Sequence, residues 1–82
     1  MMSIVTEEAG KKALCARLAR VEGQLRGLQK LIQAEAESEQ VAQQMTAARK
    51  ALDKAFFAMV ATLIADGKAG ADDVADILVR FA

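Results

Sequence analysis

The sequence lacks the residues from which many metal and disulfide sites are built. It has no histidine and one cysteine, Cys15, among 82 residues. A single chain with no imidazole and one thiol cannot assemble a Cys/His site for zinc or copper, and it cannot close an intramolecular disulfide. The missing disulfide is typical of a reducing compartment, so we expect a cytoplasmic protein.

Proline is also absent, glycine occurs five times, and the only aromatic residues are three phenylalanines. This composition favours helices, and the lack of Trp and Tyr excludes stacking platforms for single-stranded nucleic acid. The longest uncharged run, residues 55–65, is too short to span a bilayer, and the opening MMSIVTEE does not resemble a secretion signal. We therefore expect no membrane partner and a single helical domain over residues 1–82.

What is present is a heptad-like apolar pattern. Its first seam recurs at steps of four and three residues and comprises Leu14, Leu18, Val21, Leu25, Leu28 and Ile32. This spacing predicts a helix over residues 6–34 with Thr6 as N-cap. Such a helix is about 40 Å long and cannot bury its seam alone.

A second seam comprises Val41, Met45, Ala48, Leu52, Phe56, Met59 and Leu63. Extending the first seam would place Glu35 and Glu39 at buried positions, so we predict a turn and a second helix over 38–66, with Ser38 as N-cap. The two helices should form an antiparallel hairpin.

Gly67 and Gly70 predict a turn before a third helix over 72–81. Further apolar residues on the second helix (Phe57, Val60 and Ile64) indicate burial on two faces, which one hairpin does not provide. The expected fold is therefore all-α, with three helices and a hairpin that dimerises into a four-helix bundle.

The net charge is zero, but residues 11–30 carry six bases and one acid. Arg17 and Arg20 share one edge of the first helix with Gln24, while the second helix has its own basic group of Arg49, Lys50 and Lys54. Basic side chains along the edge of a helix can bind phosphate oxygens, but they are equally typical of an edge that is simply exposed to solvent. Spacing alone does not choose between these interpretations.

Other candidates for chemistry are few. With no histidine, two serines and one cysteine, the chain offers little to an enzyme, and we expect none. Cys15 is either a thiol activated by Lys11 and Lys12 or a small space-filler. Gly23 and Gly27 cost helix stability, which indicates that another helix, a turn or a ligand approaches there.

Two segments together resemble the copper-sensitive operon repressor family: RLARVEGQLRGLQKLI at 17–32 and VAQQMTAARKALDKA at 41–55. The resemblance covers about residues 11–67. It implies a disc-like homotetramer, a dimer of dimers, that binds double-stranded operator DNA without a helix-turn-helix and releases it when an inducer binds. The implied DNA contacts are Arg17 and Lys54, supported by Arg20, Lys11 and Lys12, and the neighbouring Arg49 and Lys50 complete the candidate set.

The chain departs from that family at its sensor. The positions of the family's copper ligands read Ser38, Leu63 and Gly67, which offer no soft ligand to Cu(I). We therefore expect no metal and no cofactor. Leu63, with Phe56, Met59 and Val60 around it, forms either plain core packing or a pocket for a hydrophobic inducer.

These observations lead to one functional expectation and one alternative. The expectation is a DNA-binding, repressor-like regulator without the usual Cu(I), Ni, Co or thiol site, whose inducer is unknown. The alternative is an oligomeric interaction protein that does not bind DNA, or a subunit that mixes with a metal-sensing paralogue.

Overall fold

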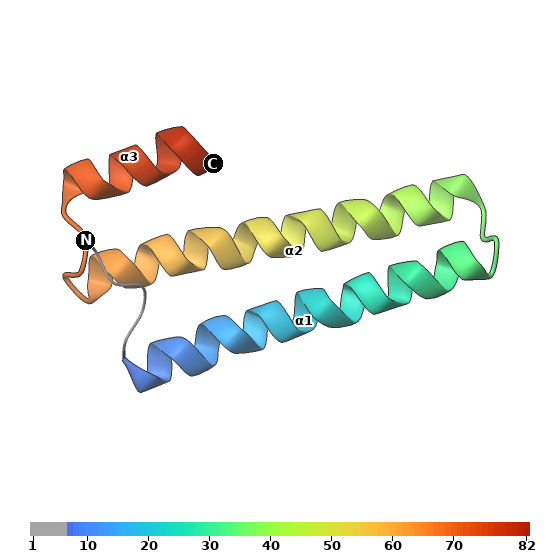
Figure 1. The fold of residues 1–82 in the computed structure, drawn as a ribbon, viewed down its shortest axis with the longest axis horizontal. Helices are drawn as coiled ribbons and strands as arrows, with labels where there is room; N and C mark the ends of the chain where they lie inside the picture. The colour runs from blue at the N-terminus through green and yellow to red at the C-terminus, as the bar shows by residue number, and fades with distance from the viewer. Residues whose placement is uncertain (1–6) are drawn as a thin grey trace.

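The structure, a computed structural model, describes residues 7–82. It contains three α-helices, α1 (Glu8–Gln33), α2 (Ser38–Ala65) and α3 (Ala71–Phe81). Helices α1 and α2 lie side by side and antiparallel, and α3 lies beside α2 on the side away from α1 (Figure 1). The all-α fold class is confirmed. The helices begin and end within two residues of their predicted bounds, and the predicted N-cap Thr6 lies outside the described residues.

Both long helices end in the same backbone motif. At the end of α1, Glu35 adopts a left-handed conformation (φ 56°), and the N–H of Ala36 donates to Leu31 O at 3.0 Å. At the end of α2, Gly67 is left-handed (φ 67°), and the N–H of Lys68 donates to Leu63 O at 3.0 Å. These six-to-one bonds satisfy carbonyls that a helix end would otherwise leave unpaired. Because Glu35 takes the left-handed position at the end of α1, no glycine marks that turn in the sequence.

The helix starts differ from the sequence prediction in one detail. Glu37, not Ser38, is the N-cap of α2, and its carbonyl accepts the N–H of Val41 at 3.1 Å. Ser38 is the first helical residue. At the start of α3, the carboxylate of Asp73 accepts the backbone N–H of Gly70 at 3.2 Å, so an acid stabilises a helix whose N-cap has no side chain.

The predicted apolar seams divide into two rows. On α1, Val21 and Leu28 are buried, whereas Leu18, Leu25 and Ile32 are about half exposed. On α2, the buried residues are Ala48, Ala55, Val60 and Leu63. Alternate members of the first seam therefore contact α2, whereas on α2 only Ala48 and Leu63 of the predicted seam are buried, and Ala55 and Val60 lie outside that seam. Small residues at 48 and 55 allow the two helices to pack closely.

The exposed seam residues form one apolar face, which we define as Leu18, Leu25, Ile32, Met45 and Leu52. Each is 43–53% exposed. The Cα atoms extend 47 × 27 × 17 Å, so the protein is one layer of helices thick. A single layer cannot cover both sides of its helices, and this face is consequently uncovered in one chain. Leu18 and Leu52 border the same apolar hollow of about 530 Å³, which shows that the two rows meet on one side of the layer.

Helix α3 adds little to the core. It has no buried residue, and Val79 and Phe81 are 85% and 66% exposed. The apolar side of α3 therefore packs only loosely against the rest of its own chain. None of the helices in the described part is long and apolar enough to cross a bilayer.

The close approach expected at Gly23 and Gly27 is not made within residues 7–82 of one chain. A Cβ atom built at either position would meet no heavy atom within 4 Å. A side chain at either glycine would therefore meet open space in a single chain. A partner of the hairpin, and not the hairpin itself, would have to supply any contact there.

Candidate nucleic-acid interface

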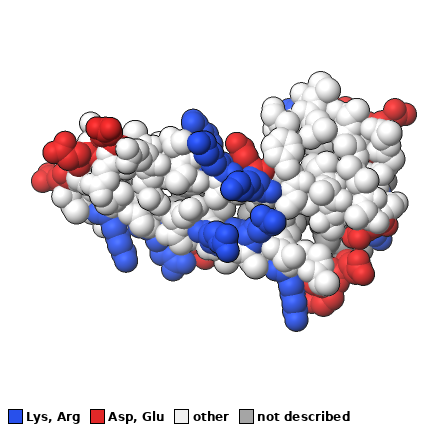
Figure 2. Space-filling model, turned by 180° about the vertical axis from the view of Figure 1, so that it is seen from behind, with Lys and Arg blue, Asp and Glu red and all other residues white. Residues whose placement is uncertain are grey.

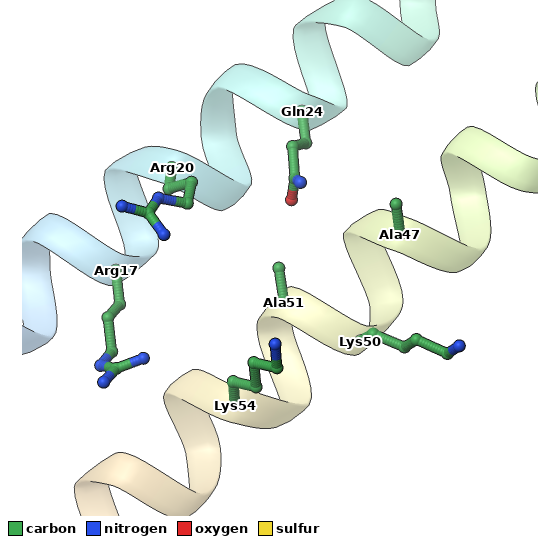
Figure 3. A pocket seen from close by; sticks show the side chains of 7 residues that line it. All are labelled: Arg17, Arg20, Gln24, Ala47, Lys50, Ala51 and Lys54. Atoms are coloured by element: carbon green, nitrogen blue, oxygen red, sulfur yellow. The ribbon is translucent and has the colours of Figure 1, made fainter.

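Four basic side chains from α1 and α2 surround a hollow between the two helices (Figure 3). The hollow has a volume of about 320 Å³ and is lined by Arg17, Arg20, Gln24, Ala47, Lys50, Ala51 and Lys54. We call this set the basic groove. Its members are distant in sequence, and the antiparallel hairpin brings them together at mid-length.

Helical spacing explains why each helix contributes a continuous edge. Residues three and four apart lie on the same side of a helix, which aligns Arg17, Arg20 and Gln24 on α1. The same rule aligns Ala47 with Ala51, and Lys50 with Lys54, on α2. On both helices this edge and the apolar face lie on opposite sides of the buried row, so cations and exposed hydrophobic residues occupy different faces of the layer.

The side chains in the groove have different directions. The guanidinium of Arg17 reaches toward α2, the amine of Lys54 turns back toward Ala51, and Lys50 extends away from the gap (Figure 3). Because alanines form the α2 wall, the tips of the long side chains stand above a recess. The arrangement offers cations at the rim and open space beneath them.

The cations of the groove have no carboxylate partner among the described residues. Ion pairs occur elsewhere, between Lys11 and Glu8 (3.1 Å), Arg26 and Glu22 (3.2 Å), and Arg80 and Asp76 (3.4 Å). On the face opposite to that of Figure 1, basic side chains gather over the middle of the molecule with an acidic side chain beside them, and most of the other acidic side chains lie toward its ends (Figure 2). Concentrated, unneutralised positive charge in a concave surface attracts anions, although the chain as a whole is neutral.

Gln24 is the uncharged polar residue that lines this site. Its Oε1 atom is buried and accepts no hydrogen bond from residues 7–82, whereas its backbone carbonyl accepts the Nε2–H of Gln44 at 3.5 Å. The amide points into the space between the helices (Figure 3). A buried, unpartnered acceptor costs free energy unless a guest supplies a donor.

The other predicted basic residues lie outside the groove. Lys11 is paired with Glu8, while Lys12 and Arg49 are exposed and do not line the hollow. Arg49 is adjacent to Lys50 in sequence, but one residue turns a helix by about 100°, which directs it away from the groove. Ala47 and Ala51 are lining residues that were not predicted from the sequence. Their spacing of four along the Lys50–Lys54 edge was the available signal.

Ser38, Leu63 and Gly67, which the resemblance aligns with metal ligands, do not form a metal site within one chain. Ser38 begins α2, whereas Leu63, which is 3% exposed, lies about 37 Å away along the same helix, so one chain cannot bring the two together. Leu63 and Gly67 carry no donor side chain for a metal. Within residues 7–82 there is no group of three or more His, Cys, Asp or Glu side chains that could hold an ion.

Two further sequence candidates have clear locations. Cys15 is a free, exposed thiol on α1, away from the basic groove. Leu63 and Val60 are core residues, at 3% and 6% exposure, while Phe56 and Met59 line the apolar hollow of about 530 Å³ without them. The predicted cluster around Leu63 is thus divided between core packing and a separate surface hollow.

Comparison with protein families gives one match over most of the chain. Residues 10–79 match the family described as metal-sensitive transcriptional repressor. Comparisons with curated proteins and with solved structures give no significant match. The match spans all three helices and both edges of the basic groove. The chain therefore belongs to the family of metal-sensitive transcriptional repressors.

Proposed function

We propose that this protein is a cytoplasmic, DNA-binding repressor whose basic groove contacts the phosphate backbone of a double-stranded operator. The observation that carries the proposal is the group of four cations, two from each helix of the hairpin, that have no carboxylate partner within residues 7–82. Arginine forks and lysine tips on a rigid scaffold bind phosphate oxygens well. The family to which the chain belongs supports the same conclusion, since its members repress transcription.

Binding to DNA would require several copies of the chain. One chain has zero net charge and a single groove, and few phosphate contacts give weak binding at physiological salt. The apolar face supplies a means of assembly, because its half-exposed residues repeat every seven positions on each helix, as in the seam of a helical bundle. We propose a dimer that forms a four-helix bundle through this face, and a tetramer built from two such dimers.

Salt titration tests the DNA-binding proposal directly. We expect the intact protein to bind a duplex from its own promoter region with an affinity that falls steeply with salt, because each phosphate contact contributes about −0.9 to the slope of log K against log [salt]. Fluorescence anisotropy from low to high sodium chloride measures this slope. A slope near zero, or no binding at low salt, would contradict the proposal and favour an interaction protein without DNA affinity.

We also propose that the protein does not sense copper through the positions used by its relatives. A copper titration in competition with a Cu(I) chelator is expected to leave the metal with the chelator, because the donor set lacks imidazole and contains one thiol per chain. The Cys15→Ala variant serves as the control for thiolate binding between chains. Tight, stoichiometric uptake of Cu(I) by the unmodified protein, lost in that variant, would show that Cys15 forms a site across subunits.

No observation favours catalysis, and we propose no enzymatic role. No feature of the described residues specifically supports a mixed tetramer of this chain with a metal-sensing paralogue. It would be recognised by co-purification of the two chains together with a lack of DNA affinity in this chain alone.

A further inference from the structure

We propose that the basic groove also binds a compact soluble polyphosphate, and that this ligand releases the protein from DNA. The proposal rests on the proposed function, since it assigns a regulator to the groove that would contact the operator. The ligand class is a short chain of phosphoryl groups, either free pyrophosphate or the phosphate chain of a nucleotide.

The recess below the cations is the first observation. A DNA backbone is convex and needs only the tips of basic side chains at its surface. The groove has in addition a hollow of about 320 Å³ walled by Ala47 and Ala51, in the range of about 300 to 1,000 Å³ that is typical of small-molecule sites. A ligand of a few phosphoryl groups is small enough to enter this space, whereas a duplex is not.

The charge around the recess is the second observation. No Asp or Glu lines the hollow, and its four cations make no ion pair within residues 7–82. Arg17 and Arg20 come from the α1 wall and Lys54 from the α2 wall, so a ligand lying between the helices is contacted from two sides, while Lys50 extends away from the gap. A polyphosphate, with several negative charges on adjacent groups, neutralises more of this charge than a monovalent ion does.

Gln24 is the third observation, and it is independent of charge. Its side chain points into the same recess, and its buried Oε1 has no hydrogen-bond donor. Turning the amide presents NH₂ to a phosphoryl oxygen, and leaving it in place accepts a hydroxyl group such as that of a ribose. A purely hydrophobic guest would leave this polar group unsatisfied.

Such a ligand would act as an inducer by simple competition. Phosphoryl groups in the recess occupy the arginine and lysine side chains that would otherwise hold the DNA backbone. Because Ser38, Leu63 and Gly67 offer no metal site, this form of release needs no metal ion.

Two measurements on the full chain test the proposal, with pyrophosphate as the probe. By calorimetry at fixed ionic strength, we expect saturable binding that is about tenfold tighter than that of orthophosphate, since the second phosphoryl group adds charge-assisted hydrogen bonds. By anisotropy, pyrophosphate at about ten times its Kd should raise the apparent Kd for DNA about tenfold. Sodium chloride at matched ionic strength is the control. ADP in parallel distinguishes a nucleotide, bound more tightly than pyrophosphate, from the phosphate chain alone.

A variant that fills the hollow distinguishes binding inside the recess from binding to positive charge at the surface. Ala51→Leu keeps all four cations and fills the hollow, so pyrophosphate affinity should fall about tenfold or more. Ala19→Leu, at an exposed position of α1 outside the groove, should bind as the unmodified protein does. If Ala51→Leu loses helical circular dichroism, Ala47→Leu replaces it, since Ala47 is exposed, lines the same hollow and leaves all four cations in place.

The possible failures are distinguishable. Absence of saturable pyrophosphate binding, or DNA release no greater than that by sodium chloride, overturns this inference and leaves DNA binding intact. Equal affinity of pyrophosphate for the Ala51→Leu and Ala19→Leu variants overturns the recess as its site. Pyrophosphate binding without any DNA binding overturns the proposed function while the anion site stands.

Discussion

Alanine at both Arg17 and Lys54 is expected to lower the affinity for operator DNA by about a thousandfold near 0.15 M salt. If two chains of the assembly face the duplex, four phosphate contacts are lost, and the slope of log K against log [salt] becomes shallower by about 3.6. Anisotropy titrations at several salt concentrations give both quantities. The fold should be unaffected, because both side chains are exposed and neither contributes to the core.

Two controls make this test specific. The double variant Arg26→Ala, Lys68→Ala removes the same charge from exposed positions outside the groove, and its slope should stay close to that of the unmodified protein. The exchange Arg17→Lys, Lys54→Arg keeps the charge, and it should preserve the slope if phosphates and not base edges are contacted. Unchanged binding by the alanine variant would show that these residues are wrongly assigned.

Glutamate in place of Leu25 is expected to dissociate the assembly. Leu25 is 48% exposed in one chain and lies in the middle of the apolar face. A dimer through this face would bury two carboxylates and lose two leucine contacts, at a cost of at least about 4 kcal/mol, or about a thousandfold in the dimer Kd. Light scattering should then give the mass of one chain, 8.8 kDa, instead of about 35 kDa for four chains.

Ala19→Glu is the matched control, since it introduces the same charge on the exposed outer side of α1, and it should keep the full mass. DNA binding should fall in the Leu25 variant although the groove is untouched, because phosphate contacts from separate chains no longer add. If the mass stays at that of the unmodified protein, the apolar face is not the interface. If the unmodified protein itself has the mass of one chain, the proposed dimer and tetramer are both contradicted.

The basic groove and the apolar face lie on different sides of the hairpin, which explains how a chain with zero net charge can offer one surface to DNA and another to a partner chain. On α1 the row of Val21 and Leu28 packs against α2, with basic residues on one side of it and Leu18, Leu25 and Ile32 on the other. A partner chain can therefore cover the apolar face and leave the groove free. We expect the positive potential of an assembly to come from the repetition of grooves and not from net charge.

The sequence predicted the helices well because their signals are local. Seams with steps of three and four residues, and the change of phase between Ile32 and Val41, are enough to place two antiparallel helices and the turn between them. The turn itself was harder to locate in detail, since Glu35 adopts a left-handed conformation more usual for glycine, and Glu37 replaces Ser38 as N-cap. Cap geometry depends on backbone angles that residue type only biases.

The sequence by itself determined that this chain is helical, that it has no histidine, and that its single cysteine cannot form an intramolecular disulfide, because these follow from residue types and their local periodicity. Only the tertiary structure decided which apolar residues of each helix are buried and which cations lie near one another. Packing of α1 on α2 fixes the rotation of each helix about its own axis. That rotation brings Arg17 and Arg20 together with Lys50 and Lys54 around a recess and leaves Arg49, Lys11 and Lys12 outside it.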